Sequence, residues 1–206
     1  MGHKPLMELK YSPTSPYVRK VMVVAHELGI TDCLRLINMD PRADTTVLSR
    51  LNPLSKIPTL ITDNGGVMVD SSVICEFLDA EFGNHRLVPG SGQRRWEIMV
   101  RSVLAQGILD AAILVRLEEI RPEGERSADW IKVQLGKAAS ALDYFETAMR
   151  DVSSNPDLAQ ITLGCTLGWL EFRHPHRPWF AQREHLQRWY AEFAKRPSMR
   201  ATAPNA

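Results

Sequence analysis

A short polar segment near the start of the chain, Tyr11-Ser-Pro-Thr-Ser-Pro16, contains groups that could stabilise an anion. Ser15 followed by Pro16 is typical of a helix start: the serine hydroxyl caps a free amide, and proline has no amide to leave unpaired. A hydroxyl donor beside the positive end of a helix dipole stabilises a negative charge. Ser15 is therefore either a plain N-cap or an anion-binding donor.

Asp70 and Ser71 lie where a predicted strand ends and a predicted helix begins. One interpretation is structural, with Ser71 or Ser72 as the N-cap and Asp70 favoured there by the helix dipole. The other is functional, because the same helix end can bind a carboxylate. Both can hold at once.

The elements around these residues predict a small mixed sheet. A strand over residues 6–11, a helix from Pro16 that stops at Gly29, and a strand over 33–37 form a parallel unit, because a helical crossover returns the chain in the same direction. After a weak helical stretch at 48–51, strands over 58–63 and 67–70 are joined by Asn64-Gly-Gly66, a strong hairpin signal. A helix over 71–82 follows. This order indicates an α/β, thioredoxin-like domain.

The second half of the chain predicts helices only. Residues 85–93 indicate a linker between a domain at 1–84 and an all-helical domain at 94–206. Helical patterns cover about 94–121, 130–149, 157–172 and 182–195, followed by a polar tail. Asp157 and Gln160 have the spacing of a capping box, and the almost wholly apolar helix that they open is expected at the centre of the bundle.

Composition excludes several classes of protein. The 206 residues carry 25 basic and 24 acidic side chains, a net charge of +1, which does not favour nucleic-acid binding. The three cysteines form no CxxC pair, no signal peptide is evident, and no apolar run approaches a membrane span. We expect a soluble cytoplasmic protein. His174 and His176 stand beside a proline in Arg173-His-Pro-His-Arg177, a segment that contains no acid or cysteine, so we expect a solvated loop and no metal site.

Two longer motifs resemble a known family. Asn52-Pro-Leu-Ser-Lys-Ile-Pro-Thr-Leu60, followed by Asp70-Ser-Ser-Val-Ile74, is similar to the N-P-x-x-K-[IV]-P-x-L and [ED]-S-x-x-I patterns of cytosolic glutathione transferases. Thr14-Ser-Pro-Tyr17 resembles the first-helix signature of the serine-type members, especially the plant tau class and bacterial proteins with a T-S-P-[FY] start. The resemblance implies the architecture predicted above, with a helical-bundle C-terminal domain.

The resemblance also implies a glutathione site. A cis Ile57-Pro58 bond would present the Ile57 backbone to the cysteinyl part of glutathione, with Lys56 beside it. Ser71 would bind the γ-glutamyl carboxylate and Asp70 the ammonium. Asp110, a lone acid in an apolar helical stretch, is either a salt-bridge residue or an acid that reaches the γ-glutamyl ammonium across a dimer.

In the implied chemistry, Ser15 donates a hydrogen bond to the glutathione thiolate, with Ser12 and then Thr14 as rival donors. A thiol with a pKa of about 8.5 is mostly protonated near neutrality, so such a donor raises the concentration of the nucleophile. The implied protein is a homodimeric glutathione transferase that conjugates glutathione to a small hydrophobic electrophile, without nucleic-acid or membrane partners. The alternatives are another glutathione-dependent activity (isomerase, dehalogenase, peroxidase or thiol reductase) and a non-catalytic binding protein.

Overall fold

The computed structural model describes residues 6–148 and 155–204. These residues form two compact units. The first contains the described residues up to Ser91 together with those from Ala201 onward, and the second contains Gly92–Arg200. Each unit has its own buried core, as described below.

Unit 1 is built on a four-stranded sheet in the order β2-β1-β3-β4. β1 pairs in parallel with β2, whereas the β1–β3 and β3–β4 pairs are antiparallel. The predicted parallel unit and hairpin are therefore confirmed. The strands are β1 (Met7–Tyr11), β2 (Leu34–Asn38), β3 (Thr59–Ile61) and β4 (Val67–Val69).

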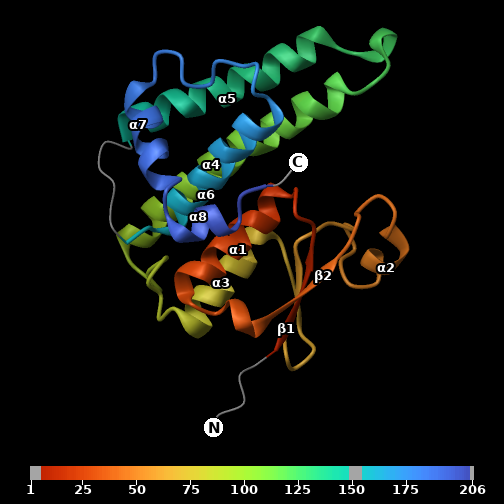
Figure 1. Cartoon of the computed structure of the whole chain (residues 1–206), viewed down its shortest axis with the longest axis vertical. Helices are drawn as coiled ribbons and strands as arrows, with labels where there is room; N and C mark the ends of the chain where they lie inside the picture. The colour runs from red at the N-terminus through yellow and green to blue at the C-terminus, as the bar shows by residue number, and fades with distance from the viewer. Residues whose placement is uncertain (1–5, 149–154, 205–206) are drawn as a thin grey trace. The chain divides into compact units, whose positions relative to one another are not determined.

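Two helices, α1 (Pro16–Leu28) and α3 (Ser71–Phe82), pack side by side against the sheet (Figure 1). Gly29 ends α1 in the left-handed conformation, with φ 70°, and its amide donates to the carbonyls of Ala25 and His26. Each helix buries an apolar face, which includes Val21 and Val24 in α1 and Ile74 and Leu78 in α3. The shorter helices are η1 (Thr31–Cys33) and α2 (Thr45–Ser49).

In the described part of unit 2, all regular elements are helices. Its centre is α6, in which every residue from Leu158 to Leu170 is buried, as its apolar composition predicts. The Asp157–Gln160 capping box at its start is confirmed. The elements are α4 (Gln93–Glu119), η2 (Glu123–Glu125), α5 (Ala128–Ala148), α6 (Leu158–Arg173), α7 (Glu184–Phe193) and α8 (Pro197–Ala201).

A glycine in α6 permits an unusually close helix contact. A Cβ added to Gly164 would lie 2.5 Å from Cε1 of Phe193 in α7 and 3.4 Å from the methyl carbon of Met199 in α8. Real Cβ atoms do not approach other atoms at 2.5 Å. The absence of a side chain at Gly164 is thus a condition for the packing of α7 against α6.

The predicted linker and the predicted polar tail are both partly packed. In the predicted linker, the amides of Leu87 and Val88 donate to the carboxylate of Asp79 at 3.0 and 2.8 Å, and both side chains are buried. In the predicted polar tail, α8 buries Ser198 and Met199. In both segments, contacts with residues elsewhere in the fold outweigh the polar local sequence.

The helix α4 corrects a further expectation. Among the described residues, it is long and apolar enough, by length and composition alone, to span a membrane. It packs against α5 and α6, however, and buries a stripe that includes Ile108, Ala112 and Val115. A core helix of a bundle has these same properties.

Candidate functional site

The strand register places three polar segments at one end of the sheet. Lys10 pairs with Thr59 in the antiparallel β1–β3 ladder, so β1 ends where β3 begins. Thr59 also pairs with Val69, so β4 ends at the same place. The residues that follow β1, precede β3 and follow β4 therefore meet at this end of the sheet, which is called the sheet edge from here on. They are the predicted site residues of unit 1: Ser12, Thr14, Ser15, Lys56, Ile57, Pro58, Asp70 and Ser71.

Ser15 caps α1, as its position before Pro16 predicts. Its backbone is extended, and its Oγ accepts a hydrogen bond from the amide of Val18 at 3.3 Å. The half-buried hydroxyl donates its own proton to no residue that the structure describes. The first turn of α1 contains no acidic side chain. The Ser15 hydroxyl is thus anchored as an acceptor, and its donor capacity is unused.

The two rival hydroxyls belong to the turn before the helix. Ser12 and Thr14 are half-buried, and within residues 6–148 and 155–204 neither side chain makes a hydrogen bond. Ser12 is linked to Ser15 through the backbone, because its carbonyl accepts from the Ser15 amide at 3.2 Å. Of the three, Ser15 alone combines a free proton with a helix start.

The Ile57–Pro58 bond is cis, as predicted. The buried Asn52 holds the preceding residue in place: its Nδ2 donates to the Lys56 carbonyl at 3.0 Å, and the Thr59 hydroxyl donates to the same carbonyl at 2.8 Å. The Lys56 side chain is exposed. The amide and carbonyl of Ile57 make no hydrogen bond with any described residue. Asn52, which the sequence shows only as part of a motif, therefore positions a backbone that is open to a ligand.

Asp70 is the N-cap of α3, so the expectation that Ser71 or Ser72 caps this helix is wrong. Asp70 has φ 69° and accepts the amide of Ser72 at 2.7 Å. Ser72 instead accepts a hydrogen bond from Nζ of the buried Lys20, at 3.0 Å. Ser71 is the first helical residue, and its hydroxyl is buried without a hydrogen-bond partner in the described part of the chain.

This edge of unit 1 has the features of a binding site for a small peptide-like anion. The N-termini of α1 and α3 both begin there, and helix N-termini favour negative groups. The Ile57 backbone can pair with an extended ligand backbone. The unpaired Ser71 hydroxyl is a further polar group that a ligand could satisfy.

Asp110 belongs to the other unit. It is exposed on α4. Its role in a glutathione site stays a prediction.

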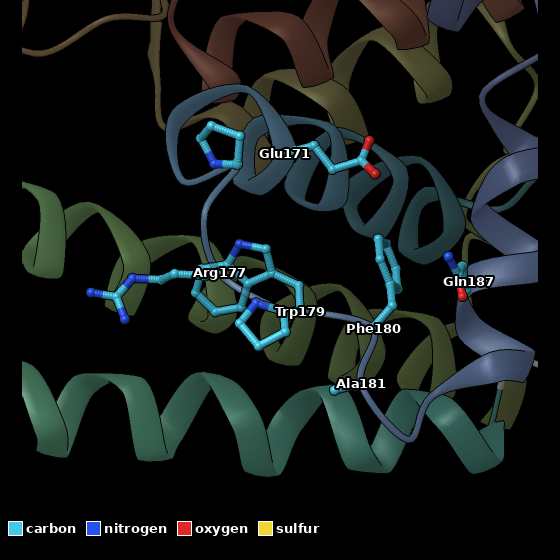
Figure 2. A pocket seen from close by; sticks show the side chains of 8 residues that line it. Glu171, Arg177, Trp179, Phe180, Ala181 and Gln187 are labelled. Carbon is cyan, nitrogen blue, oxygen red and sulfur yellow. The ribbon is translucent and has the colours of Figure 1, made fainter.

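A surface cavity of about 480 Å³ lies within unit 2 and includes none of the predicted site residues. Figure 2 shows Trp179 and Phe180 on the loop between α6 and α7, with Glu171 on α6 above them and Gln187 on α7 beside Phe180. All the residues that line this cavity belong to unit 2.

The histidine loop of unit 2 corrects another expectation. Pro175 and His176 are exposed as expected, but His174 is fully buried at the end of α6. Its Nε2 lies 3.2 Å from the carbonyl oxygen of Ala112. Burial lowers the pKa of His174, against the opposing effect of the nearby Glu119 carboxylate. The buried ring is consequently neutral near pH 7.

Comparison with known proteins identifies the family. The family models for the N-terminal and C-terminal domains of glutathione S-transferase match residues 14–81 and 128–192, respectively. The chain is also 31% identical to the "uncharacterized GST-like protein YibF" of Escherichia coli K12, over 96% of this chain and 98% of that protein.

The chain belongs to the glutathione S-transferase family.

Solved structures of other family members are similar over their whole length. A glutathione transferase family member from Pseudomonas fluorescens Pf-5 with bound glutathione is 40% identical, with a TM-score of 0.92 over 97% of this chain and 100% of that one. A glutathione S-transferase from Methylobacillus flagellatus KT with bound glutathione is 37% identical, with a TM-score of 0.89 over 97% and 100% of the two chains. The predicted architecture, a thioredoxin-like domain and a helical domain, is the architecture of this family.

Proposed function

We propose that this glutathione S-transferase binds glutathione at the sheet edge of unit 1 and activates its thiol for attack on a small hydrophobic electrophile. Support for binding comes from the similar Pseudomonas and Methylobacillus proteins, both of which were crystallised with glutathione. Further support comes from the convergence of two helix starts and a free backbone segment at one edge.

The observation that carries the activation step is the state of the Ser15 hydroxyl. It accepts a hydrogen bond from Val18 and keeps its proton for another acceptor. Accepting one hydrogen bond polarises a hydroxyl and strengthens the bond that it donates. A thiolate beside Ser15 would receive that bond together with the dipole of α1, and both favour the ionised form.

The remaining residues would hold the peptide. The Ile57 amide and carbonyl would pair with the cysteinyl backbone, in the manner of an added strand. The Ser71 hydroxyl and the start of α3 would bind the γ-glutamyl carboxylate. Asp70 uses one carboxylate oxygen as the helix cap, and its negative charge would attract the γ-glutamyl ammonium. These contacts are made before and during the reaction, so they serve binding more than rate.

In the reaction, the thiol proton leaves to solvent and Ser15 stabilises the sulfur anion without taking the proton. The sulfur lone pair then forms a bond to the electrophilic carbon, and the leaving group departs with its electron pair. Holding glutathione and the electrophile together in reactive geometry would contribute to the rate. A serine hydroxyl cannot form a mixed disulfide with glutathione, so we propose conjugation ahead of thiol exchange.

The decisive experiment is a pH titration of the thiolate absorbance of bound glutathione. A hydrogen bond to a charged group contributes about 1.5–3 kcal/mol, so Ser15→Ala should raise the pKa of the bound thiol by about one to two units. Glutathione affinity should stay nearly constant, because the peptide contacts remain. Ser12→Ala and Thr14→Ala are the matched controls. If Ser15→Ala titrates like the wild type while Ser12→Ala shifts, the donor is Ser12.

A panel of aryl halides, epoxides, peroxides and disulfides identifies the reaction class. Conjugation predicts turnover with the first two groups, and a dominant activity on peroxides or disulfides would replace it. Retention on immobilised glutathione without turnover of any of the four groups would instead indicate a binding protein.

A further inference from the structure

The buried imidazole of His174 has an unused acceptor nitrogen. The Ala112 carbonyl can only accept a hydrogen bond, so the contact at 3.2 Å places the proton on Nε2. In a neutral ring, Nδ1 then carries a lone pair. This atom is buried and has no hydrogen-bond partner among the described residues. A buried lone pair without a donor is unusual and calls for a ligand.

A carboxylate faces the same nitrogen. Oε2 of Glu119 lies 3.6 Å from Nδ1, while Oε1 accepts a hydrogen bond from Arg177. Two acceptors that face each other repel unless a proton or a cation lies between them. At 3.6 Å the two atoms are too far apart to share a proton in a hydrogen bond. A metal cation would satisfy both atoms.

A second imidazole stands beside this pair. His176 is exposed, and its ring centroid lies 6.1 Å from that of His174. One possible ligand atom from each of Glu119, His174 and His176 lies within 4.8 Å of the other two. Bonds from zinc to nitrogen or oxygen are about 2.0–2.2 Å long, so the ligand atoms must draw closer together than this. His176 is exposed, so its side chain has room to turn toward the other two ligands.

We propose that Glu119, His174 and His176 bind a divalent cation of the zinc class, through Nδ1 of His174, a carboxylate oxygen of Glu119 and one ring nitrogen of His176. Two imidazoles and one carboxylate suit Zn²⁺, and water would complete a tetrahedral site. This site lies within unit 2, and the proposal does not depend on the proposed glutathione chemistry.

The surroundings of His174 are those of a rigid ligand. Its ring packs edge-on against Trp169 and Trp179, at centroid distances of 5.6 and 5.9 Å. The Nε2 hydrogen bond to a backbone carbonyl is the usual support of a metal-binding histidine. Arg177 orients the Glu119 carboxylate, and its positive charge should keep the affinity for zinc moderate. The bound ion would join the end of α4 to the loop after α6.

The test is zinc titration of the whole chelator-washed protein in competition with a chromophoric chelator. The wild type should bind one equivalent. His176→Ala and Glu119→Gln should each weaken binding at least about tenfold, since even the loss of a supporting residue costs that much. His185→Ala, which removes another exposed histidine of unit 2, should bind like the wild type. Zinc should raise the thermal midpoint of the wild type and of His185→Ala, but not of His176→Ala.

The proposal is overturned if the wild type binds no stoichiometric zinc, or if His176→Ala and His185→Ala bind it equally well. A Co²⁺ derivative with a thiolate charge-transfer band would also overturn it, because the ion would then lie on one of the buried cysteines. Glutathione affinity should be the same in all these variants, so this result and that of the glutathione titration are independent.

Discussion

The start of α6 in unit 2 is capped differently from the starts of α1 and α3 in unit 1. At the start of α6, both carboxylate oxygens of the cap and its amide are used. Asp157 Oδ1 accepts from the Gln160 amide, Oδ2 accepts from Arg94 and Arg101, and the Asp157 amide donates to Gln160 Oε1. At the starts of α1 and α3, the Ser15 proton and the Ser71 hydroxyl find no partner among the described residues.

This difference indicates which cap serves the stability of the fold and which caps serve ligand binding. A fully satisfied cap contributes to folding and has nothing left to offer a ligand. A cap with unused donors can form further hydrogen bonds with a ligand, but the unused donors lower the stability of the ligand-free protein. We therefore expect substitutions at the α6 cap to change stability alone, and substitutions at the α1 and α3 starts to change glutathione affinity or reactivity.

The largest effect should follow from Asp157→Ala. This change removes the cap and leaves the half-buried Arg101 without its carboxylate, so we expect unit 2 to lose about 2–4 kcal/mol. All five tryptophans lie in unit 2, so the urea dependence of their emission reports its unfolding. Asp157→Asn keeps a capping oxygen and should lose less. An equal loss in both variants would show that the charge, and not the cap, dominates.

Asp70→Asn should have the next largest effect. Asparagine caps a helix as well as aspartate does and tolerates the positive φ, so stability should hold. The loss of the charge should weaken glutathione binding about tenfold by calorimetry. Cysteinylglycine, which lacks the γ-glutamyl group, is the control ligand, and its affinity should not change. A parallel loss for both ligands would remove Asp70 from the ammonium site.

A smaller effect is expected for Ser71→Ala. The loss of one hydroxyl contact should raise the KM for glutathione about fivefold and change kcat less, because the contact serves uniform binding. The unfolding midpoint should not fall, since the hydroxyl is unpaired in the free protein. Ser102→Ala is the matched control, because Ser102 in α4 also has a buried hydroxyl without a partner in the described structure. A midpoint that falls only in Ser71→Ala would show a structural role for this hydroxyl.

The smallest effect is expected for Glu8→Gln in β1. Like Asp157, Glu8 contacts two cations, but it is more exposed. Hydrogen bonds from Arg35 and, to a lesser degree, Lys10 lower the pKa of Glu8 below its ordinary value of 4.5. The ionised carboxylate therefore stabilises the protein above about pH 4.5, and this contribution is lost as the pH falls through the lowered pKa.

Thermal midpoints measured against pH check this last prediction. At pH 7, Glu8→Gln should cost less than about 1 kcal/mol, and the difference from the wild type should vanish in acid. A difference that persists in acid would indicate packing instead of charge.

Local sequence predicted the elements that begin and end at distinctive residues. Pro16 and Gly29 delimit the first helix, and Asn64-Gly-Gly66 makes the hairpin. The identity of the α3 cap was missed, because the positive φ of Asp70 is set at the end of β4 and is not visible in its neighbours in sequence. Serine is also a common cap, so its preference was a weak guide.

Features that depend on distant residues were not predictable. The burial of His174 depends on Ala112 and Glu119, more than fifty residues earlier in the chain. The packing of Leu87 and Val88 depends on a single carboxylate, Asp79. For the candidate site, the motifs predicted which residues take part. The unpaired state of the Ser71 hydroxyl depends on the packing around it, so it is visible only in the three-dimensional structure.

The close helix contact at Gly164 has a consequence for engineering this protein. Replacing helical glycines by alanine is a standard route to higher stability, with a gain of up to about 1 kcal/mol for each suitable position. Gly107 and Gly136 have open space where a methyl group would go, and they suit that strategy. Gly164 does not, because the new methyl group would collide with the Phe193 ring. A design guided by helix propensity alone would treat all three alike, and at Gly164 it would separate the helices that it was meant to stabilise.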